Sequence, residues 1–160
     1  MQKSYLVLTT IFLSVFTLFS QTPKDTLLVE NVVVLDWQPT FKMALKKSKK
    51  QNKPVLIYFT GSDWCSPCKI LDEKLFHTLK FKEIADTDLI LYEANNPRNK
   101  DLVTPTKLEE NYNLIRKYKI KSYPTLILVN HKGKMIGYKK GLILTEYYYP
   151  FIQSVIETIN

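Results

Sequence analysis

The feature that most constrains this fold is an unbroken hydrophobic run, Val55 to Phe59, that ends shortly before the only two cysteines of the chain. A strand with hydrophobic side chains on both faces needs cover on both faces, as a central strand has in a sheet flanked by helices. The residues just before the run, Asn52 to Pro54, break any helix that precedes it. We therefore predict that residues 55–59 form the central strand of an α/β sheet.

Further strands and helices are predicted from the residue patterns on either side of this run. Residues 28–35 are predicted to form a first strand, and a helix with hydrophobic residues on one face then opens at Thr40. After the run, a second helix begins near Cys65 and continues through Thr78. Residues 88–92 are predicted to form a short buried strand, parallel to the central one because strand-helix-strand connections are right-handed.

The second half of the chain completes the predicted sheet. Residues 95–107 are polar, contain prolines and lack periodicity, so we predict a surface loop followed by another helix. The segment from Asn130 to Gly133 favours a tight turn between two antiparallel strands, 125–129 and 134–140. A last helix starts near Pro150. The order β-α-β-α-β-α-β-β-α predicts one sheet of mixed direction with helices on both faces.

The composition fits a single globular domain. The chain has 160 residues, of which 45% are hydrophobic and 24% are charged. That hydrophobic content can offset the chain entropy lost on folding, which excludes a disordered protein. Two cysteines are too few for a disulfide-stapled scaffold. We predict one domain over residues 21–160.

Residues 1–20 have the pattern of a secretory signal peptide. Lys3 precedes an uncharged stretch from Leu6 to Phe19, and the small Ser20 follows. A membrane-spanning helix needs about 20 hydrophobic residues, so an uncleaved anchor is the less favoured alternative. We predict cleavage after Ser20 and a periplasmic or secreted protein. Export argues against nucleic acid as the partner of this basic chain, and the lysines between positions 46 and 53 are interpreted as the solvated side of a helix.

Both cysteines lie in the segment from Trp64 to Lys69, Trp-Cys-Ser-Pro-Cys-Lys, after the predicted central strand and at the start of a helix. Backbone N–H groups at a helix start stabilise a thiolate, so Cys65 is the predicted attacking thiol. Cys68 lies within one helical turn of it, where its sulfur can attack a mixed disulfide and release the product. This pattern predicts a redox-active Cys65–Cys68 disulfide, with no other cofactor and no metal.

Two separated motifs give the chain a resemblance to a known family. The segment from Val55 to Lys69, and Ser122 to Thr125 (Ser-Tyr-Pro-Thr) before a later strand, resemble the thioredoxin family. The resemblance is to its exported branch, similar to the C-terminal domain of the transmembrane thiol-disulfide reductant conductor, and covers roughly residues 28 to 159.

This resemblance implies a thioredoxin fold with a mixed five-stranded sheet centred on residues 54–60. It also implies that the peptide bond before Pro124 is cis and that the Tyr123 backbone faces the sulfurs and pairs with an extended substrate. The implied substrate-binding residues are Trp64, Pro67, Tyr123 and Pro124.

One position departs from the family pattern. Many thioredoxins carry a buried Asp on the central strand that accepts the proton of the second cysteine, and the corresponding positions here are Tyr58 and Phe59. Neither side chain is a base at neutral pH. Asp63, Lys69 or a water molecule would then assist Cys68, and we predict slower resolution of the mixed disulfide than in a typical thioredoxin.

Other interpretations of these residues are weaker. A structural disulfide across so short a loop would constrain the unfolded chain little. A zinc site completed by His77 and His131 has none of the common ligand spacings. Trp64 suits a core position as well as a substrate-facing one. Residues Tyr147 to Tyr149 are interpreted as packing of the last helix rather than as a binding patch.

Together these observations predict an exported thiol-disulfide oxidoreductase that acts on disulfide-containing exported proteins. Reduction is favoured over oxidation or isomerisation because Pro67 stands where reducing thioredoxins also carry proline. A reductase in an oxidising compartment must be recharged, so a membrane thiol electron donor is an expected partner. The alternative from a different class is a binding module in which Cys65 and Cys68 hold Cu(I), although the sequence places no third soft ligand near them.

Overall fold

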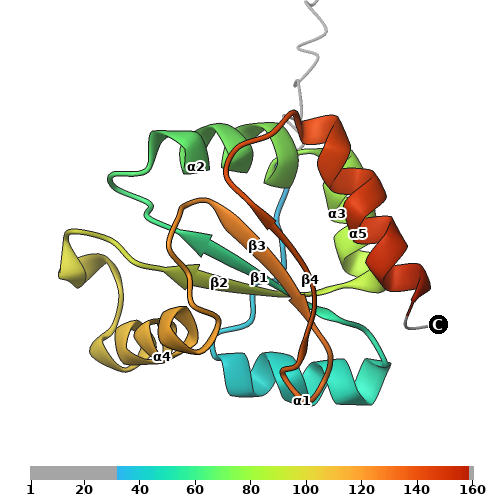
Figure 1. Ribbon diagram of the computed structural model, residues 1–160, viewed down its shortest axis with the longest axis horizontal. Helices are drawn as coiled ribbons and strands as arrows, with labels where there is room; N and C mark the ends of the chain where they lie inside the picture. Colours follow the sequence, from blue (N-terminus) through green and yellow to red (C-terminus); the bar gives the residue numbers. More distant parts are fainter. Residues whose placement is uncertain (1–31, 159–160) are drawn as a thin grey trace, which may run out of the picture. The chain divides into compact units, whose positions relative to one another are not determined.

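Strand β1 (Val55–Thr60) lies inside the sheet, between β2 (Ile90–Asn95) on one side and β3 (Thr125–Val129) on the other. β2 runs parallel to β1, whereas β3 runs antiparallel to it, and β4 (Met135–Lys140) pairs with β3 as an antiparallel hairpin (Figure 1). Every residue of β1 is buried. The prediction of a central strand in an α/β sheet is therefore confirmed.

The computed structural model describes residues 32–158. The predicted signal peptide, residues 1–20, and residues 28–31 of the predicted first strand lie outside this range. Among the described residues, no helix is both long enough and hydrophobic enough to cross a membrane.

Helices cover both faces of the sheet, as predicted. α1 (Phe41–Gln51) and α4 (Pro105–Lys117) pack on one face, while α2 (Ser66–Leu71), α3 (Leu79–Asp88) and α5 (Tyr148–Glu157) pack on the other (Figure 1).

Two hydrophobic cores result, because side chains of a strand point alternately to opposite faces of the sheet. Ile57 and Phe59 of β1 belong to the core beneath α1 and α4. Tyr58 belongs to the other core, which also contains both cysteines. The strand that precedes the cysteines therefore shares a core with them.

The prediction of five strands is wrong for the described residues, in which the sheet has four. Residues 32–36 form no strand, and Trp37 makes a single parallel bridge to Leu91 of β2. The Trp37 N–H is bonded to the carbonyl oxygen of Leu35, two residues back, at 3.1 Å. The chain therefore turns on itself here instead of forming a ladder along β2, and Val32 and Val34 remain 75% and 68% exposed.

The single helix predicted from Cys65 through Thr78 is divided in the structure. α2 continues into a π-helical turn (Asp72–Phe76), and α3 begins immediately after Thr78. The Thr78 hydroxyl accepts a hydrogen bond from the N–H of Phe81 at 3.2 Å and thus caps the start of α3. The hydrophobic pattern runs through both helices, so periodicity alone does not reveal this cap.

Most other helices and strands begin or end within a few residues of the predicted positions. β2 begins at Ile90 rather than at residue 88 and extends to Asn95. The predicted 95–107 loop contains a short 3-10 turn (Lys100–Leu102), and α4 starts within it because Thr104 caps a helix with proline in its first turn. The predicted turn from Asn130 to Gly133 is confirmed, and Gly133 has a φ of 71°, which glycine adopts without strain.

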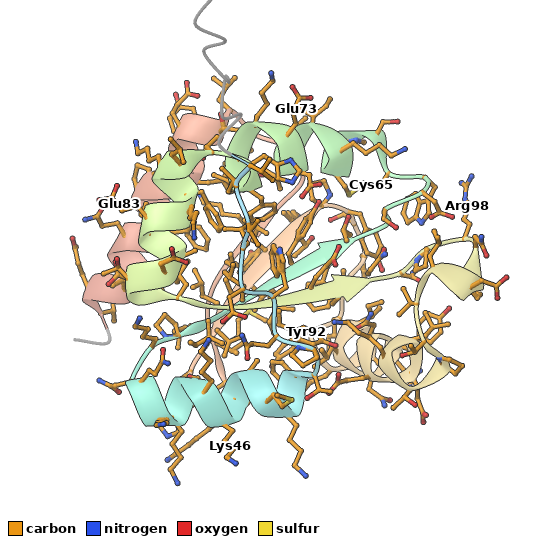
Figure 2. All side chains as sticks on the ribbon, turned by 180° about the vertical axis from the view of Figure 1, so that it is seen from behind. Lys46, Cys65, Glu73, Glu83, Tyr92 and Arg98 are labelled. Atoms are coloured by element: carbon orange, nitrogen blue, oxygen red, sulfur yellow. A yellow bond between two sulfur atoms is a disulfide. The ribbon has the colours of Figure 1, made fainter. Side chains whose placement is uncertain are left out.

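Surface and packing predictions outside the site are borne out for Lys46, Tyr148 and Tyr149. Lys46 projects from the exposed side of α1 (Figure 2). Tyr148 is buried, and its hydroxyl donates a 2.7 Å hydrogen bond to the carbonyl oxygen of Gly141. Tyr149 is hydrogen-bonded to the Thr78 hydroxyl at 3.1 Å. These two tyrosines therefore hold α5 in place, as the packing interpretation predicted. That interpretation is wrong for Tyr147, which is 57% exposed.

Candidate active site

The two cysteines lie where the chain passes from β1 into α2, and they form a disulfide. Figure 2 places Cys65 at the beginning of this helix, at one end of the sheet. Cys65 caps α2, with the N–H of Cys68 3.2 Å from its sulfur. Both cysteines are buried, with exposed fractions of 3% and 1%. In the reduced protein the same N–H group would stabilise a thiolate on Cys65.

The loop before Cys65 is fixed by hydrogen bonds to the end of β2. The amide oxygen of Asn95 accepts from the Ser62 N–H at 3.0 Å, and its amide nitrogen donates to the Ser62 hydroxyl at 2.8 Å. Asn111 of α4 donates to the carbonyl oxygen of Asn95 at 2.7 Å. Sequence reasoning missed this anchor, because an Asn at the end of a strand does not by itself indicate its partner.

Trp64 is held on several sides. Its indole N–H donates to the carbonyl oxygen of Asn96 at 2.9 Å, and its ring meets the Tyr123 ring edge-on, with 5.3 Å between centroids. The ring also lies directly on Gly61, where an added Cβ would come within 2.2 Å of it. Trp64 remains half-buried, so it fills a structural position and still presents a surface beside Cys65.

The structure brings the second predicted motif to this site. The Tyr123–Pro124 peptide bond is cis, as the resemblance implied. Pro124 is buried, whereas Tyr123 is half-buried and its hydroxyl accepts a 3.3 Å hydrogen bond from the side chain of Asn96. The contact between the Tyr123 and Trp64 rings joins the motif to the cysteine segment. Pro67, between the cysteines, is exposed.

Asp63 and Lys69 occupy different surroundings. The Asp63 carboxylate accepts hydrogen bonds from the backbone N–H groups of Arg98 and Asn99, at 3.0 and 2.8 Å. These bonds, the one from Asn99 foremost, hold the pKa of Asp63 below its ordinary value. Lys69 is exposed and lines a small cavity beside Cys68. Their assistance to Cys68 stays a prediction.

Two further acidic residues border that cavity and were missed by sequence reasoning. They are Asp72, in the π-helical turn, and Glu93, in β2. Burial raises the pKa of each carboxyl group above its ordinary value. The predicted strand ended at residue 92, so sequence reasoning left Glu93 outside it, and its distance in sequence from Cys68 concealed the connection.

The two histidines considered as zinc ligands are both exposed, His77 at the end of the π-helical turn and His131 in the hairpin turn. Within residues 32–158, no three His, Cys, Asp or Glu side chains gather in an arrangement that could hold a metal ion.

The fold and the paired cysteines define the class of protein. Residues 41–155 match the family described as a thioredoxin-like domain, and the chain belongs to this family. It carries at the start of α2 the Cys-x-x-Cys disulfide that thiol-disulfide oxidoreductases use.

Particular relatives refine this placement. The chain is 30% identical over 110 residues to the disulfide bond reductase DsbH of Chlamydia pneumoniae, a match covering 67% of this chain and 65% of the relative. It is 28% identical over 100 residues to the thioredoxin-related protein DsbJ of the same organism, covering 62% of this chain and 28% of that relative. The matches thus span less than two thirds of either relative.

Solved structures agree with this fold. A structure of a DsbH oxidoreductase superposes with a TM-score of 0.70 at 25% identity, covering 79% of this chain and 87% of the other. A thioredoxin from Thermus thermophilus superposes with a TM-score of 0.59 at 18% identity, covering 76% and 86%, and supports the fold alone.

Proposed function

We propose that this protein is an exported disulfide reductase that opens disulfides in other exported proteins. The observation that carries the proposal is the Cys65–Cys68 disulfide at the start of α2, with the Cys68 N–H directed at the Cys65 sulfur. Pro67 and the likeness to a relative named as a disulfide bond reductase favour the reducing direction. The signal peptide pattern of residues 1–20 supports export.

The reaction begins with the reduced pair. The Cys65 thiolate attacks one sulfur of the substrate disulfide, and the other substrate sulfur leaves as a thiolate that takes a proton from water. Cys68 then loses its proton and attacks the Cys65 sulfur, which breaks the bond to the substrate and releases its second thiol. Two electrons pass to the substrate, and the Cys65–Cys68 disulfide remains.

The substrate site is proposed to lie around Cys65. Trp64, Pro67 and Tyr123 each retain exposed surface there, and the cis bond before Pro124 fixes the backbone beside the indole. An extended substrate segment would pair with the Tyr123 backbone. Because the oxidised pair must be reduced again, a membrane thiol electron donor is proposed as the second partner.

The reduction potential of the pair tests the direction of the reaction. The purified protein is equilibrated in defined dithiothreitol or glutathione buffers, and free thiols are trapped and counted by mass spectrometry. We expect a potential near or below about −230 mV, as for reductants. A potential above about −180 mV would identify a donor of disulfides and overturn the reductase proposal.

Export is tested separately by expressing the full chain in a bacterium with a periplasm. We expect the protein in the periplasmic fraction, with its N-terminus at Gln21. Retention of residues 1–20 would contradict cleavage after Ser20.

A further inference from the structure

Resolution of the mixed disulfide requires a group that removes the proton from Cys68. Tyr58 of the central strand lies beside Cys68, and its buried hydroxyl donates a 3.1 Å hydrogen bond to the carbonyl oxygen of Cys68. Burial raises the pKa of Tyr58 above its ordinary value. The phenol therefore stays protonated at neutral pH and does not act as the base.

Glu93 lies on the adjacent strand directly beside Tyr58, because the two are partners in the register of β1 and β2. It follows Leu91 by two residues, and Leu91 packs in the core that contains the cysteines. Alternation along the strand therefore directs Glu93 to the same face of the sheet. Glu93 is the only charged residue of β2, whose other residues are all buried.

A cavity of about 70 Å³ connects this carboxylate with the resolving cysteine. Cys68 and Glu93 line it together with Tyr58, Lys69 and Asp72. A cavity of about 10–15 Å³ already admits one water molecule, so a water can bridge the thiol and the carboxylate. The ion pairs formed among residues 32–158 do not involve Glu93.

We propose that Glu93 accepts the thiol proton of Cys68, through water in this cavity, when the mixed disulfide is resolved. The inference rests on the exchange chemistry of the proposed function and not on its direction. The S–H bond of Cys68 breaks and the proton passes to the carboxylate. The resulting thiolate displaces the substrate sulfur from Cys65, and the proton later returns to solvent.

The charges that face Glu93 suit this role. Burial raises the pKa of Glu93, the positive charge of Lys107 on α4 lowers it, and the negative charge of Asp72 raises it. Asp72 itself has a pKa raised by burial, which the charge of His77 opposes. Lys69 adds a cation at the exposed rim of the cavity. A carboxylate whose pKa is closer to neutral is a more effective base near neutral pH.

Stopped-flow reaction of the reduced protein with 5,5′-dithiobis(2-nitrobenzoate) separates the two steps. Attack by Cys65 releases one equivalent of thionitrobenzoate, and attack by Cys68 on the mixed disulfide releases the other. We expect Glu93→Gln to slow the second release by about tenfold or more at pH 7 and to leave the first within about twofold. The difference should shrink as pH rises, because hydroxide then removes the Cys68 proton.

Glu73→Gln is the matched control, because Glu73 lies in the neighbouring π-helical turn, is exposed and points away from the body of the molecule (Figure 2). It should follow the wild-type protein in both steps. Asp72→Asn gives a second test that keeps Glu93 in place. Removing the Asp72 charge should lower the pKa of Glu93. In a plot of the second-step rate against pH, the acidic limb should therefore move to lower pH.

An unchanged second step in Glu93→Gln, together with an unshifted profile in Asp72→Asn, would overturn the role of Glu93. So would a second step that slows in Asp63→Asn or Lys69→Met but not in Glu93→Gln. If wild-type protein releases no thionitrobenzoate at all, the proposed exchange function fails, and the inference fails with it.

Discussion

The two cysteines differ in the chemistry of their surroundings. The segment that leads into Cys65 is fixed by hydrogen bonds. The side chains of Asp63 and Trp64 both bond to the backbone of the loop after β2. Cys68 instead borders a cavity onto which two partly buried carboxyl groups, Asp72 and Glu93, open.

This contrast matches the two steps of disulfide exchange, in which the attacking and the resolving sulfur need different surroundings. The attacking sulfur needs a fixed position and a stabilised negative charge, and hydrogen bonds supply both. The resolving sulfur needs a proton acceptor, and carboxyl groups whose ionised form is destabilised by burial supply that. The predictions below test this contrast, from the largest expected effect to the smallest.

Replacing each cysteine in turn should give the largest and most distinct effects. Cys65→Ser should abolish exchange, because it removes the nucleophile. Cys68→Ser should keep the first attack and then accumulate the mixed disulfide, because no thiol remains to resolve it. Mass spectrometry after mixing with a disulfide substrate measures the adduct. Accumulation of the adduct in Cys65→Ser instead would reverse the assigned roles.

Asn95→Ala should lower the stability of the protein and slow the reaction of Cys65. The change removes two hydrogen bonds to Ser62, each worth about 0.5–1.5 kcal/mol in the free energy of unfolding. It should also slow the first step of exchange, because the loop that carries Cys65 loses its anchor. Denaturant unfolding measures the first effect, and Asn113→Ala, at an exposed helix position, is the control. Equal stability of the two variants would contradict the anchoring role.

Glu93→Gln should make the folded protein more stable at neutral pH even as it slows resolution. The pKa of Glu93 is raised in the folded state, so its ionisation disfavours folding as pH rises above the ordinary value of 4.5. The free energy of unfolding of the wild-type protein should therefore fall as pH rises from 4.5 to 7. In the variant it should fall by less. Unfolding curves at pH 4.5 and pH 7 measure the difference, and parallel pH dependences in the two proteins would count against a destabilised carboxylate.

Asp63→Asn should have a smaller effect of the opposite sign. The pKa of Asp63 is lowered in the folded state, so its ionised form favours folding above the ordinary value of 3.8, and that contribution is lost as pH falls through the lowered pKa. The variant should be slightly less stable than the wild-type protein at pH 7, with the gap closing in acid. Unfolding midpoints at pH 7 and pH 3 test this, and a gap that widens in acid would contradict it.

The sequence was sufficient to predict the central strand, the hairpin, both cysteines and the cis bond at Pro124, because each depends on a local pattern or on a motif of the family. It was insufficient for features that depend on pairing between distant segments. Asn95 and Glu93 acquire their roles only when β2 lies beside β1. Among the described residues the fifth strand was predicted wrongly, because the hydrophobic run from Val32 to Leu35 does not reveal that the chain turns at Trp37.

The cap at Thr78 has a mechanical consequence. It divides what would otherwise be one long helix, so the helical segment that carries the cysteines ends before α3 begins. α3 is anchored to the core by Phe81 and Ala85, which are buried. Opening the disulfide should therefore increase amide hydrogen exchange in α2 while the amides of α3 stay protected. We expect the structural response to the redox state to be confined to the short helix that carries the cysteines, with little change in α3 and the rest of the domain.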